Sequence, residues 1–213
     1  SNGYETKTLD HDRDIEFAID PIDVDETNMV VTIANIQTRF EKTQAIPELD
    51  CYTYSKLYTE AKRVGATVKT TALTAANVLA DFDDNLEAFA EAGVPLDRVI
   101  QRTLEISSAK GIDRRVRSVD DIDKIVEVPS SRMKSLFDFT NGCVADSSAK
   151  QIDYILIDPE AQVSRVKYSY INVYTPRSDS RTADNYIYQN RKVNGTFAID
   201  ELMKQGVIIH AEA

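Results

Sequence analysis

The chain has 213 residues, 42% hydrophobic and 28% charged, which is enough for one large domain or two small ones with a real core. Its 25 Lys and Arg residues against 35 Asp and Glu give a formal net charge of −10. Affinity for DNA comes mainly from cations, so this balance disfavours a general nucleic-acid binder. The sequence has no apolar run long enough to cross a membrane, and we expect no signal peptide.

Negative charge is concentrated at the N-terminal end, since residues 1–27 hold nine acids and two bases. Between Leu9 and Asp20, apolar and acidic residues alternate with period two. A β-strand there would point a mainly apolar set to one face and a row of carboxylates to the other. The ordinary interpretation is a half-buried strand with a solvated outer face, and the alternative is an acidic face that meets cations of another subunit.

This strand has no obvious local partner, because Pro21 ends it and a helical pattern follows. A lone strand is not stable. Three partners stay open from the residues alone: the distant C-terminal region, another chain, or residues that precede this sequence.

Two helices are predicted next. Apolar spacing after an N-cap at Thr27 predicts one long helix over about residues 28–64, kinked or briefly broken near Pro47 and ended by Gly65. Thr74 is expected to cap a second helix, which Gly93 and Pro95 end. The apolar stripe of this second helix is Val78, Leu79, Phe82, Leu86 and Phe89.

The remainder of the chain is mostly strand-like. Strands are expected over residues 102–107, 122–128, 154–157, 168–174, 186–191 and 207–210. Residues 158–161 look like a short helix start, and residues 175–183 look like a loop. Because helices come early and strands late, the fold class is α+β rather than a series of parallel βαβ units.

Few residues suit catalysis. His11 and His210 are the only histidines, and the sequence contains no HExxH, Walker or GxSxG motif. Cys51 and Cys143 are the only cysteines, and their spacing argues against a zinc ribbon, a redox motif or a disulfide-stapled scaffold. We expect each to be a small core residue, with a Cys–His dyad as the minor alternative. No cofactor or metal is predicted, since the acids at residues 20–26 lack EF-hand spacing.

One basic cluster stands out, at Lys110, Arg114, Arg115 and Arg117. Several Asp residues flank it, so a solvated or subunit-pairing loop is favoured over a DNA contact. The tyrosines of the long helix, Tyr52, Tyr54 and Tyr58, are interpreted as core-edge or subunit-contact residues rather than as ligand-stacking groups.

The order of several segments resembles a known family. These segments are LDHDRDIEFAIDPIDVDET (Leu9–Thr27), IPELDCYTYSKLYTEAKR (Ile46–Arg63), TALTAANVL (Thr71–Leu79), GVPLDRVI (Gly93–Ile100), VPSSRMKSLFDFTNG (Val128–Gly142) and IDYILIDPEAQV (Ile152–Val163). From about Leu9 to its C-terminus the chain resembles the major capsid proteins of tailed bacteriophages and prophages, which have the Hong Kong 97-type shell fold.

The resemblance implies a definite organisation. Residues 1–71 would hold the return strand of an extended hairpin, the E-loop, and a peripheral domain with a long spine helix. Residues 72–160 would form an axial domain, and residues 161–213 would return to the peripheral domain as strands. The outgoing hairpin strand would lie before residue 1, so that the N-terminal arm and half of the E-loop are absent. After Ile100 the family usually carries a further strand, turn and helix, so the chain either is shorter there or lacks a segment.

The function implied is structural and not enzymatic: a subunit that assembles with copies of itself, as pentamers and hexamers, into the head shell of a tailed phage or prophage. Scaffold and portal proteins would be further partners, packaged DNA an indirect one, and membranes none. The protein would be assembled in the bacterial cytoplasm and reside in the virion.

Within such a shell, the acidic strand residues would pair with cations of a neighbouring copy. The residues predicted for this contact are Asp12, Asp14 and Glu16 on the acidic side, and Arg114, Arg115 and Arg117 on the basic side. Two alternatives are an encapsulin-like compartment shell that holds enzyme cargo and, in another class, a small α+β enzyme that uses carboxylates as acid and base.

Overall fold

The computed structural model describes residues 6–22, 33–74, 76–104, 124–178 and 181–212. The chain divides into two compact units. The first consists of Ser1–Leu49 with Ser164–Gly195, and the second of Asp50–Val163 with Thr196–Ala213. Helices and strands occur in both units, in agreement with the α+β class predicted from the order of the elements.

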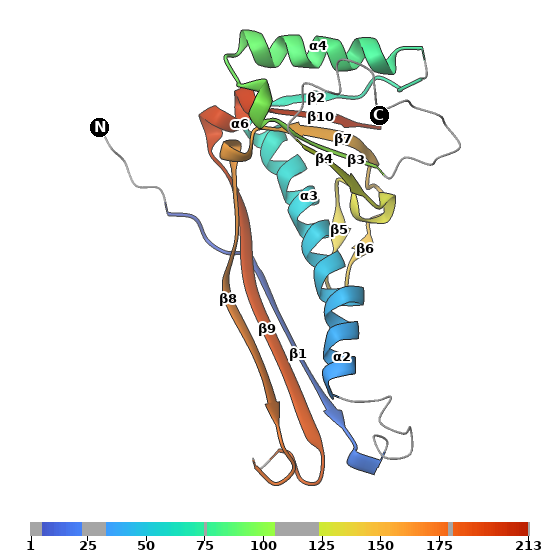
Figure 1. Ribbon diagram of the computed structural model, residues 1–213, viewed down its shortest axis with the longest axis vertical. Coiled ribbons are helices and arrows are strands. Elements are labelled where there is room, and N and C mark those ends of the chain that lie inside the picture. Colours follow the sequence, from blue (N-terminus) through green and yellow to red (C-terminus); the bar gives the residue numbers. More distant parts are fainter. Residues whose placement is uncertain (1–5, 23–32, 75, 105–123, 179–180, 213) are drawn as a thin grey trace. The chain divides into compact units, whose positions relative to one another are not determined.

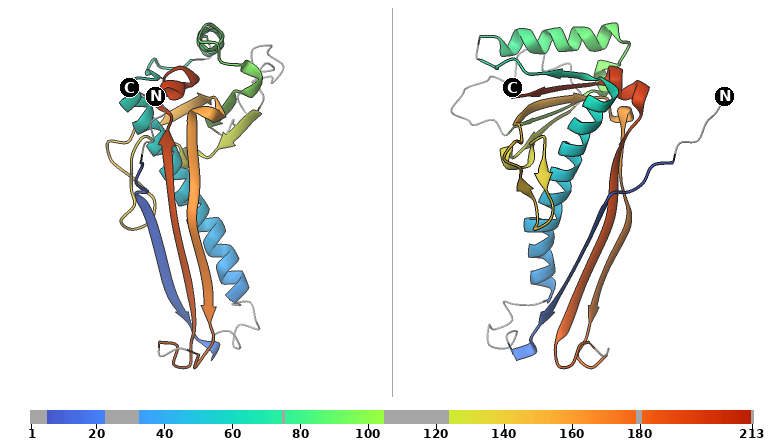
Figure 2. Two further views of the ribbon diagram at one scale, coloured as in Figure 1. Left: turned by 90° about the vertical axis from the view of Figure 1, so that its left-hand side faces the viewer. Right: turned by 180° about the vertical axis from the view of Figure 1, so that it is seen from behind.

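The first unit contains a three-stranded sheet in the order β1-β9-β8 (Figure 1). Its strands are β1 (His11–Ile19), β8 (Gln162–Tyr174) and β9 (Tyr186–Ala198), and both views of Figure 2 show them side by side. β1 runs antiparallel to β9, from His11 opposite Asn194 to Ile19 opposite Tyr186. The partner of the N-terminal strand is thus the C-terminal region. β1 is also an edge of this sheet, so the expected hairpin strand before residue 1 stays a prediction.

The predicted long helix is observed as three consecutive helical segments. These are α2 (Ile33–Phe40), a π-helical turn (Glu41–Ala45) and α3 (Ile46–Val64), and they follow one another without a break. Pro47 has no N–H to donate to the residue four positions earlier, so a wider turn just before it is a known way to relieve the conflict. The predicted irregularity near Pro47 is therefore a π-helical turn. The predicted start at residues 28–32 lies outside the described residues.

Glycines end the helices as predicted. Gly65 has a φ of +76°, a left-handed conformation in which the Ala66 N–H donates to the Ala61 carbonyl at 2.9 Å. Gly93 has a φ of +75° after α4 (Val78–Glu91), and the Val94 N–H donates there to an α4 carbonyl at 2.9 Å. Glycine has no Cβ, so it adopts this conformation without the steric cost that other residues incur.

The start of α4 differs from the prediction. Its N-cap is Asn77, not Thr74. The Asn77 Oδ1 accepts a hydrogen bond from the Thr74 N–H at 2.7 Å, which closes a turn before the helix begins. Of the predicted stripe, Phe82, Leu86 and Phe89 are buried, whereas Leu79 is exposed because it lies at the free first turn.

The second unit is built on a five-stranded mixed sheet in the order β2-β10-β7-β3-β4. Its strands are β2 (Thr67–Lys69), β3 (Ile100–Leu104), β4 (Lys124–Val128), β7 (Ile152–Ile157) and β10 (Val207–Ala211). β10 lies parallel to β2 and antiparallel to β7, and β3 lies parallel to β4 and antiparallel to β7. Strands β7 and β10 are buried on both faces, so they read as near-continuous apolar runs.

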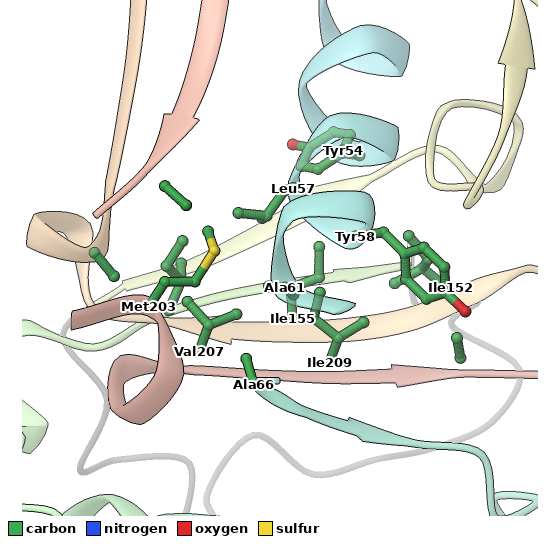
Figure 3. Close-up of a cluster of buried hydrophobic side chains, with 14 of the residues drawn as sticks. Tyr54, Leu57, Tyr58, Ala61, Ala66, Ile152, Ile155, Met203, Val207 and Ile209 are labelled. Carbon is green, nitrogen blue, oxygen red and sulfur yellow. The ribbon is translucent and has the colours of Figure 1, made fainter. Parts of the chain in front are cut away.

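Helices cover the two faces of this sheet. On one face, Phe82, Leu86 and Phe89 of α4 pack against Tyr154 and Leu156 of β7. On the other face, α3 and α6 (Asp200–Gly206) pack against the alternate strand residues, as Figure 3 shows around Met203. Successive side chains of a strand point to opposite faces, so one short strand such as β7 serves two separate clusters.

The predicted strands are all present, although their bounds differ. β8 and β9 are 13 residues each, longer than predicted, and the predicted positions 105–107 and 122–123 lie outside the described residues. Residues 159–161 form the predicted short helix as one 3-10 turn, and further 3-10 turns cover residues 96–98 and 130–132. Four short elements were not predicted from the sequence, because they are too short to show a clear periodicity: β2, α6 and the two-residue strands β5 (Phe137–Asp138) and β6 (Val144–Ala145).

The two cysteines are not separate core residues, so that prediction is wrong. Cys51 in α3 and Cys143, immediately before β6, form a disulfide across 92 positions of sequence. The β5–β6 pair brings Cys143 close to α3, and no local sequence pattern predicts this long-range contact.

Candidate interaction surface

One face of the three-stranded sheet is covered by helical residues of the same unit. The rings of Phe17 and Tyr188 lie 4.8 Å apart by centroid, and Phe40 of α2 packs on both at 6.4 and 6.3 Å. Glu41 accepts hydrogen bonds from Asn190 at 2.6 Å and from Lys192 at 2.5 Å. This covered face is the one that the alternating pattern predicted to be apolar.

Three titratable residues meet at one end of the covered face. The Arg13 Nε lies 2.5 Å from the Glu48 Oε1, and the His11 Nε2 lies 3.6 Å from the same oxygen. His11 is only 7% exposed. Burial, reinforced by the neighbouring Arg13 charge, lowers the pKa of His11 to about 4, and burial raises the pKa of Glu48.

The opposite face of the sheet carries the predicted acidic residues. In the register of β1 and β9, Asp12, Asp14 and Glu16 lie opposite Val193, Arg191 and Gln189. All three acidic residues are exposed, as the alternation in the sequence predicted. We call this the acidic face of the sheet.

Two of these three carboxylates already have cationic partners in the same chain. Asp12 accepts two hydrogen bonds from Arg191, at 3.0 and 2.5 Å, and this contact holds the pKa of Asp12 below its ordinary value. Glu16 accepts a hydrogen bond from Arg181 at 3.2 Å and another from Gln189. Arg181 and Arg191 were not predicted as partners from the sequence, because only the pairing of β1 with β9 brings them near Asp12 and Glu16.

The predicted basic partners, Arg114, Arg115 and Arg117, lie outside the described residues, as does Lys110. The pairing of the acidic strand with this cluster therefore stays a prediction.

A row of tyrosines continues the acidic face onto β8. Tyr168 and Tyr170 are nearly parallel with centroids 6.5 Å apart, and the hydroxyls of Tyr170 and Tyr174 are 3.1 Å apart. Arg181 lies over the Tyr174 ring at 5.5 Å and also bonds Glu16, so it links the aromatic row to the acidic row. These tyrosines are spaced two or four residues apart in a predicted strand, and this spacing could have placed them on one face from the sequence alone.

β8 also exposes apolar side chains to solvent. Tyr168 is 48% exposed, and Val163, Val166 and Ile171 of the same strand are exposed as well. β8 is an edge of its sheet, so within the described residues the outward backbone groups of the strand have no ladder partner. An edge strand with exposed apolar side chains is a site where another polypeptide can bind.

The second unit contains the closest approach to a catalytic arrangement. The Tyr154 hydroxyl donates to Asp81 and accepts from the Asn85 amide at 2.6 Å, and Lys69 donates to Asp81 at 2.8 Å. Burial and the Asp81 carboxylate raise the pKa of Tyr154. Burial pushes the pKa of Asp81 upward, but the hydrogen bonds from Lys69 and Tyr154 outweigh it and leave the pKa below its ordinary value.

These groups join α4 and β2 to β7, and they satisfy one another. The arrangement is that of a structural network that fixes the helix on the sheet. Within the described ranges, no group of three or more His, Cys, Asp or Glu residues could hold a metal ion. Among the same residues, no helix is long and apolar enough to span a membrane.

Comparisons with known proteins give matches in structure alone: no family model and no curated protein matches the sequence. The mature capsid of bacteriophage PhiM1 matches over 100% of this chain and 76% of its own, with a TM-score of 0.61 and 14% identity. The capsid of the cyanophage P-SCSP1u matches over 100% and 79%, with a TM-score of 0.59 and 11% identity.

A third match is a virus-like particle from Pyrococcus furiosus, over 97% of this chain and 78% of its own, with a TM-score of 0.58 and 11% identity. The chain has the Hong Kong 97-type fold. The likeness spans both compact units and the long helix, and it confirms the fold that the order of the sequence segments predicted. At such low identities the Hong Kong 97-type likeness concerns the fold, so function requires its own support.

Proposed function

We propose that the chain is a major capsid protein, a subunit that assembles with copies of itself into the icosahedral head shell of a tailed phage or prophage. The observation that carries this proposal is the structural likeness over nearly the whole chain to proteins described as phage capsids. Pentamers and hexamers of the chain, with scaffold and portal proteins as further partners, would build the shell in the bacterial cytoplasm, and the protein would act by geometry rather than as an enzyme.

The surface of the first unit supports self-assembly. A strand edge that exposes Val166, Tyr168 and Ile171 is unfavourable in a monomer, because it invites uncontrolled pairing with other chains. In a shell, neighbouring copies would remove such surface from water and gain the hydrophobic free energy of burial. The acidic face beside it would bias which surfaces meet.

Electron microscopy of the full-length protein expressed alone tests the proposal. We expect closed shells or capsomer rings. A full-length protein that stays monomeric across the micromolar range in light scattering would contradict the proposal.

For the subunit contact, we propose that the acidic strand residues Asp12, Asp14 and Glu16 meet Arg114, Arg115 and Arg117 of a neighbour. Asp14 is the best residue to mutate, because changes at Asp12 or Glu16 would also remove their contacts with Arg191 or Arg181 in the same chain. We expect Asp14→Arg to block assembly while the circular dichroism spectrum stays unchanged. The matched control is Asp84→Arg, an exposed charge reversal on α4. Normal shells from Asp14→Arg would refute the pairing.

We also propose the domain division of the resemblance. Residues 1–71 and 161–213 would form the peripheral domain with its spine helix and hairpin arm, and residues 72–160 the axial domain. The compact units support a discontinuous first domain, because Ser164–Gly195 groups with Ser1–Leu49, but they place residues 50–71 and 196–213 with residues 72–160. Limited proteolysis of the shells, with mapping of the cleaved loops, would test these boundaries.

A second candidate function is an encapsulin-like compartment shell. It is favoured by the match to the virus-like particle from Pyrococcus furiosus, whose TM-score of 0.58 is close to those of the phage capsids. Genes for a terminase and a portal beside this one would favour the phage head, and a neighbouring cargo enzyme would favour the compartment. Shells purified from the native host would contain DNA in the first case and an enzyme in the second.

A further inference from the structure

The disulfide between Cys51 and Cys143 lies in the second unit and joins two segments that are far apart in sequence. Cys51 lies in α3 and is 3% exposed, whereas Cys143 is half-buried immediately before β6. We propose that this pair is a reversible redox clamp. The chain adopts its fold with both thiols reduced, and oxidation by a small-molecule disulfide then locks the β5–β6 segment onto α3.

Non-covalent contacts already hold the two segments together. Asp50, which precedes Cys51, accepts a hydrogen bond from Arg132 at 3.0 Å. Tyr52, which follows Cys51, packs edge-on against Phe139 with centroids 6.1 Å apart. These two contacts flank Cys51 on the helix and involve Arg132, just before the segment that carries Cys143, and Phe139 within it, so they hold the two sulfurs near each other without the disulfide.

The segment that carries Cys143 has its own internal structure. β5 and β6 pair antiparallel with Phe137 opposite Ala145, and a bridge between Lys134 and Gln151 closes the base of the segment. The backbone N–H of Ser135 donates to the Lys150 carbonyl at 2.9 Å. The position of Cys143 is therefore set by backbone pairing and does not depend on the disulfide.

Cys143 is more exposed than Cys51, so Cys143 reacts first with the small-molecule disulfide. The Cys143 thiolate, the more accessible one, attacks a sulfur of the small-molecule disulfide. The S–S bond breaks, and one small thiolate leaves with the bonding electron pair and takes up a proton. The Cys51 thiolate then attacks the Cys143 sulfur of the mixed disulfide and releases the second small thiol. Two protein thiols become one disulfide, while the small disulfide gains the two electrons and two protons and becomes two thiols.

The clamp closes a loop of the chain between positions 92 apart. A cross-link over so long a loop restricts the unfolded chain and therefore favours the folded state. The oxidised protein is expected to unfold at a higher temperature than the reduced protein, by on the order of 10 °C.

The test uses the protein purified under dithiothreitol and then exposed to oxidised glutathione. We expect the reduced protein to have a native circular dichroism spectrum and two reactive thiols. After oxidation, the intact mass should fall by two hydrogen atoms, both thiols should be lost, and the spectrum should not change. The unfolding temperature should rise, and dithiothreitol should reverse the rise.

Cys143→Ser is the matched control, with Cys51→Ser as its counterpart for the buried position. Cys143→Ser should fold like the reduced protein and show no rise in unfolding temperature on oxidation. Three results would each overturn the proposal: a reduced protein that does not fold, thiols that persist after oxidation of the folded protein, or disulfides between chains instead of within one. A folded shell that shows the mass loss would support the clamp, and a folded monomer that shows it would support the clamp while failing the proposed function.

Discussion

Replacing His11 by glutamine is expected to make the protein less sensitive to acid. His11 is buried at the end of β1, beside Arg13 and Glu48, and its imidazole is neutral in the folded protein at neutral pH. Glutamine keeps a hydrogen-bonding side chain at the site and carries no charge at any pH. The wild type must take a proton into this buried position as the pH falls, and His11→Gln does not.

The magnitude follows from the pKa of His11, which burial lowers from 6.5 to about 4. Between these two values the unfolded chain binds the proton more readily than the folded chain does. The wild type therefore loses stability as the pH falls from about 6.5 to about 4, and the part due to His11 is about 3 kcal/mol at most. Above about pH 6.5 the difference between the two proteins should not vary with pH.

Two other carboxylates near the site also contribute to the pH dependence of stability. Glu48, whose pKa is raised by burial, adds stability as the pH falls, and Asp12, whose pKa Arg191 lowers, removes it. Both groups are present in the wild type and in His11→Gln. The informative quantity is thus the difference between the two proteins at each pH, not either curve alone.

Urea unfolding at a series of pH values measures this difference in the free energy of unfolding. Proton NMR of the unassembled protein gives a second readout, since His11 and His210 are the only histidines and His11→Gln removes one imidazole signal. Parallel stability curves for the two proteins would refute the reasoning. An imidazole signal of His11 that titrates near pH 6.5 in the folded protein would refute it as well.

Three further changes test the core, a helix end and the polar network. Met203→Ala removes a fully buried side chain and should cost about 2–5 kcal/mol in urea unfolding, whereas Leu202→Ala, at a residue 44% exposed, should cost much less. Gly65→Ala puts a Cβ on a residue with a φ of +76° and should lower the free energy of unfolding by about 1 kcal/mol, although no atom lies within 4 Å of that Cβ. Asp81→Asn weakens the contact with Lys69 and should cost about 1–3 kcal/mol, and an unchanged thermal midpoint would show that the network contributes little.

Local chemistry allowed the side-chain directions of β1 and two helix ends to be predicted from the sequence alone. The period-two pattern of residues 9–20 predicted which side chains of β1 lie on the acidic face, because the direction of a side chain in a strand depends only on its place in the alternation. Gly65 and Gly93 predicted two helix ends, because only glycine adopts the left-handed conformation there at little cost. The Hong Kong 97-type fold was implied by the resemblance of the ordered segments to a known family, not by local chemistry.

The tertiary structure alone decided which distant residues meet. It paired β1 with β9, gave Asp12 and Glu16 their arginine partners, and joined Cys51 to Cys143. It also buried His11 beside Arg13 and Glu48 and so lowered its pKa. The physical reason is common to all of these: ion pairs, disulfides and burial depend on distances in space, and residues that are far apart in the sequence acquire those distances only when the whole chain has folded.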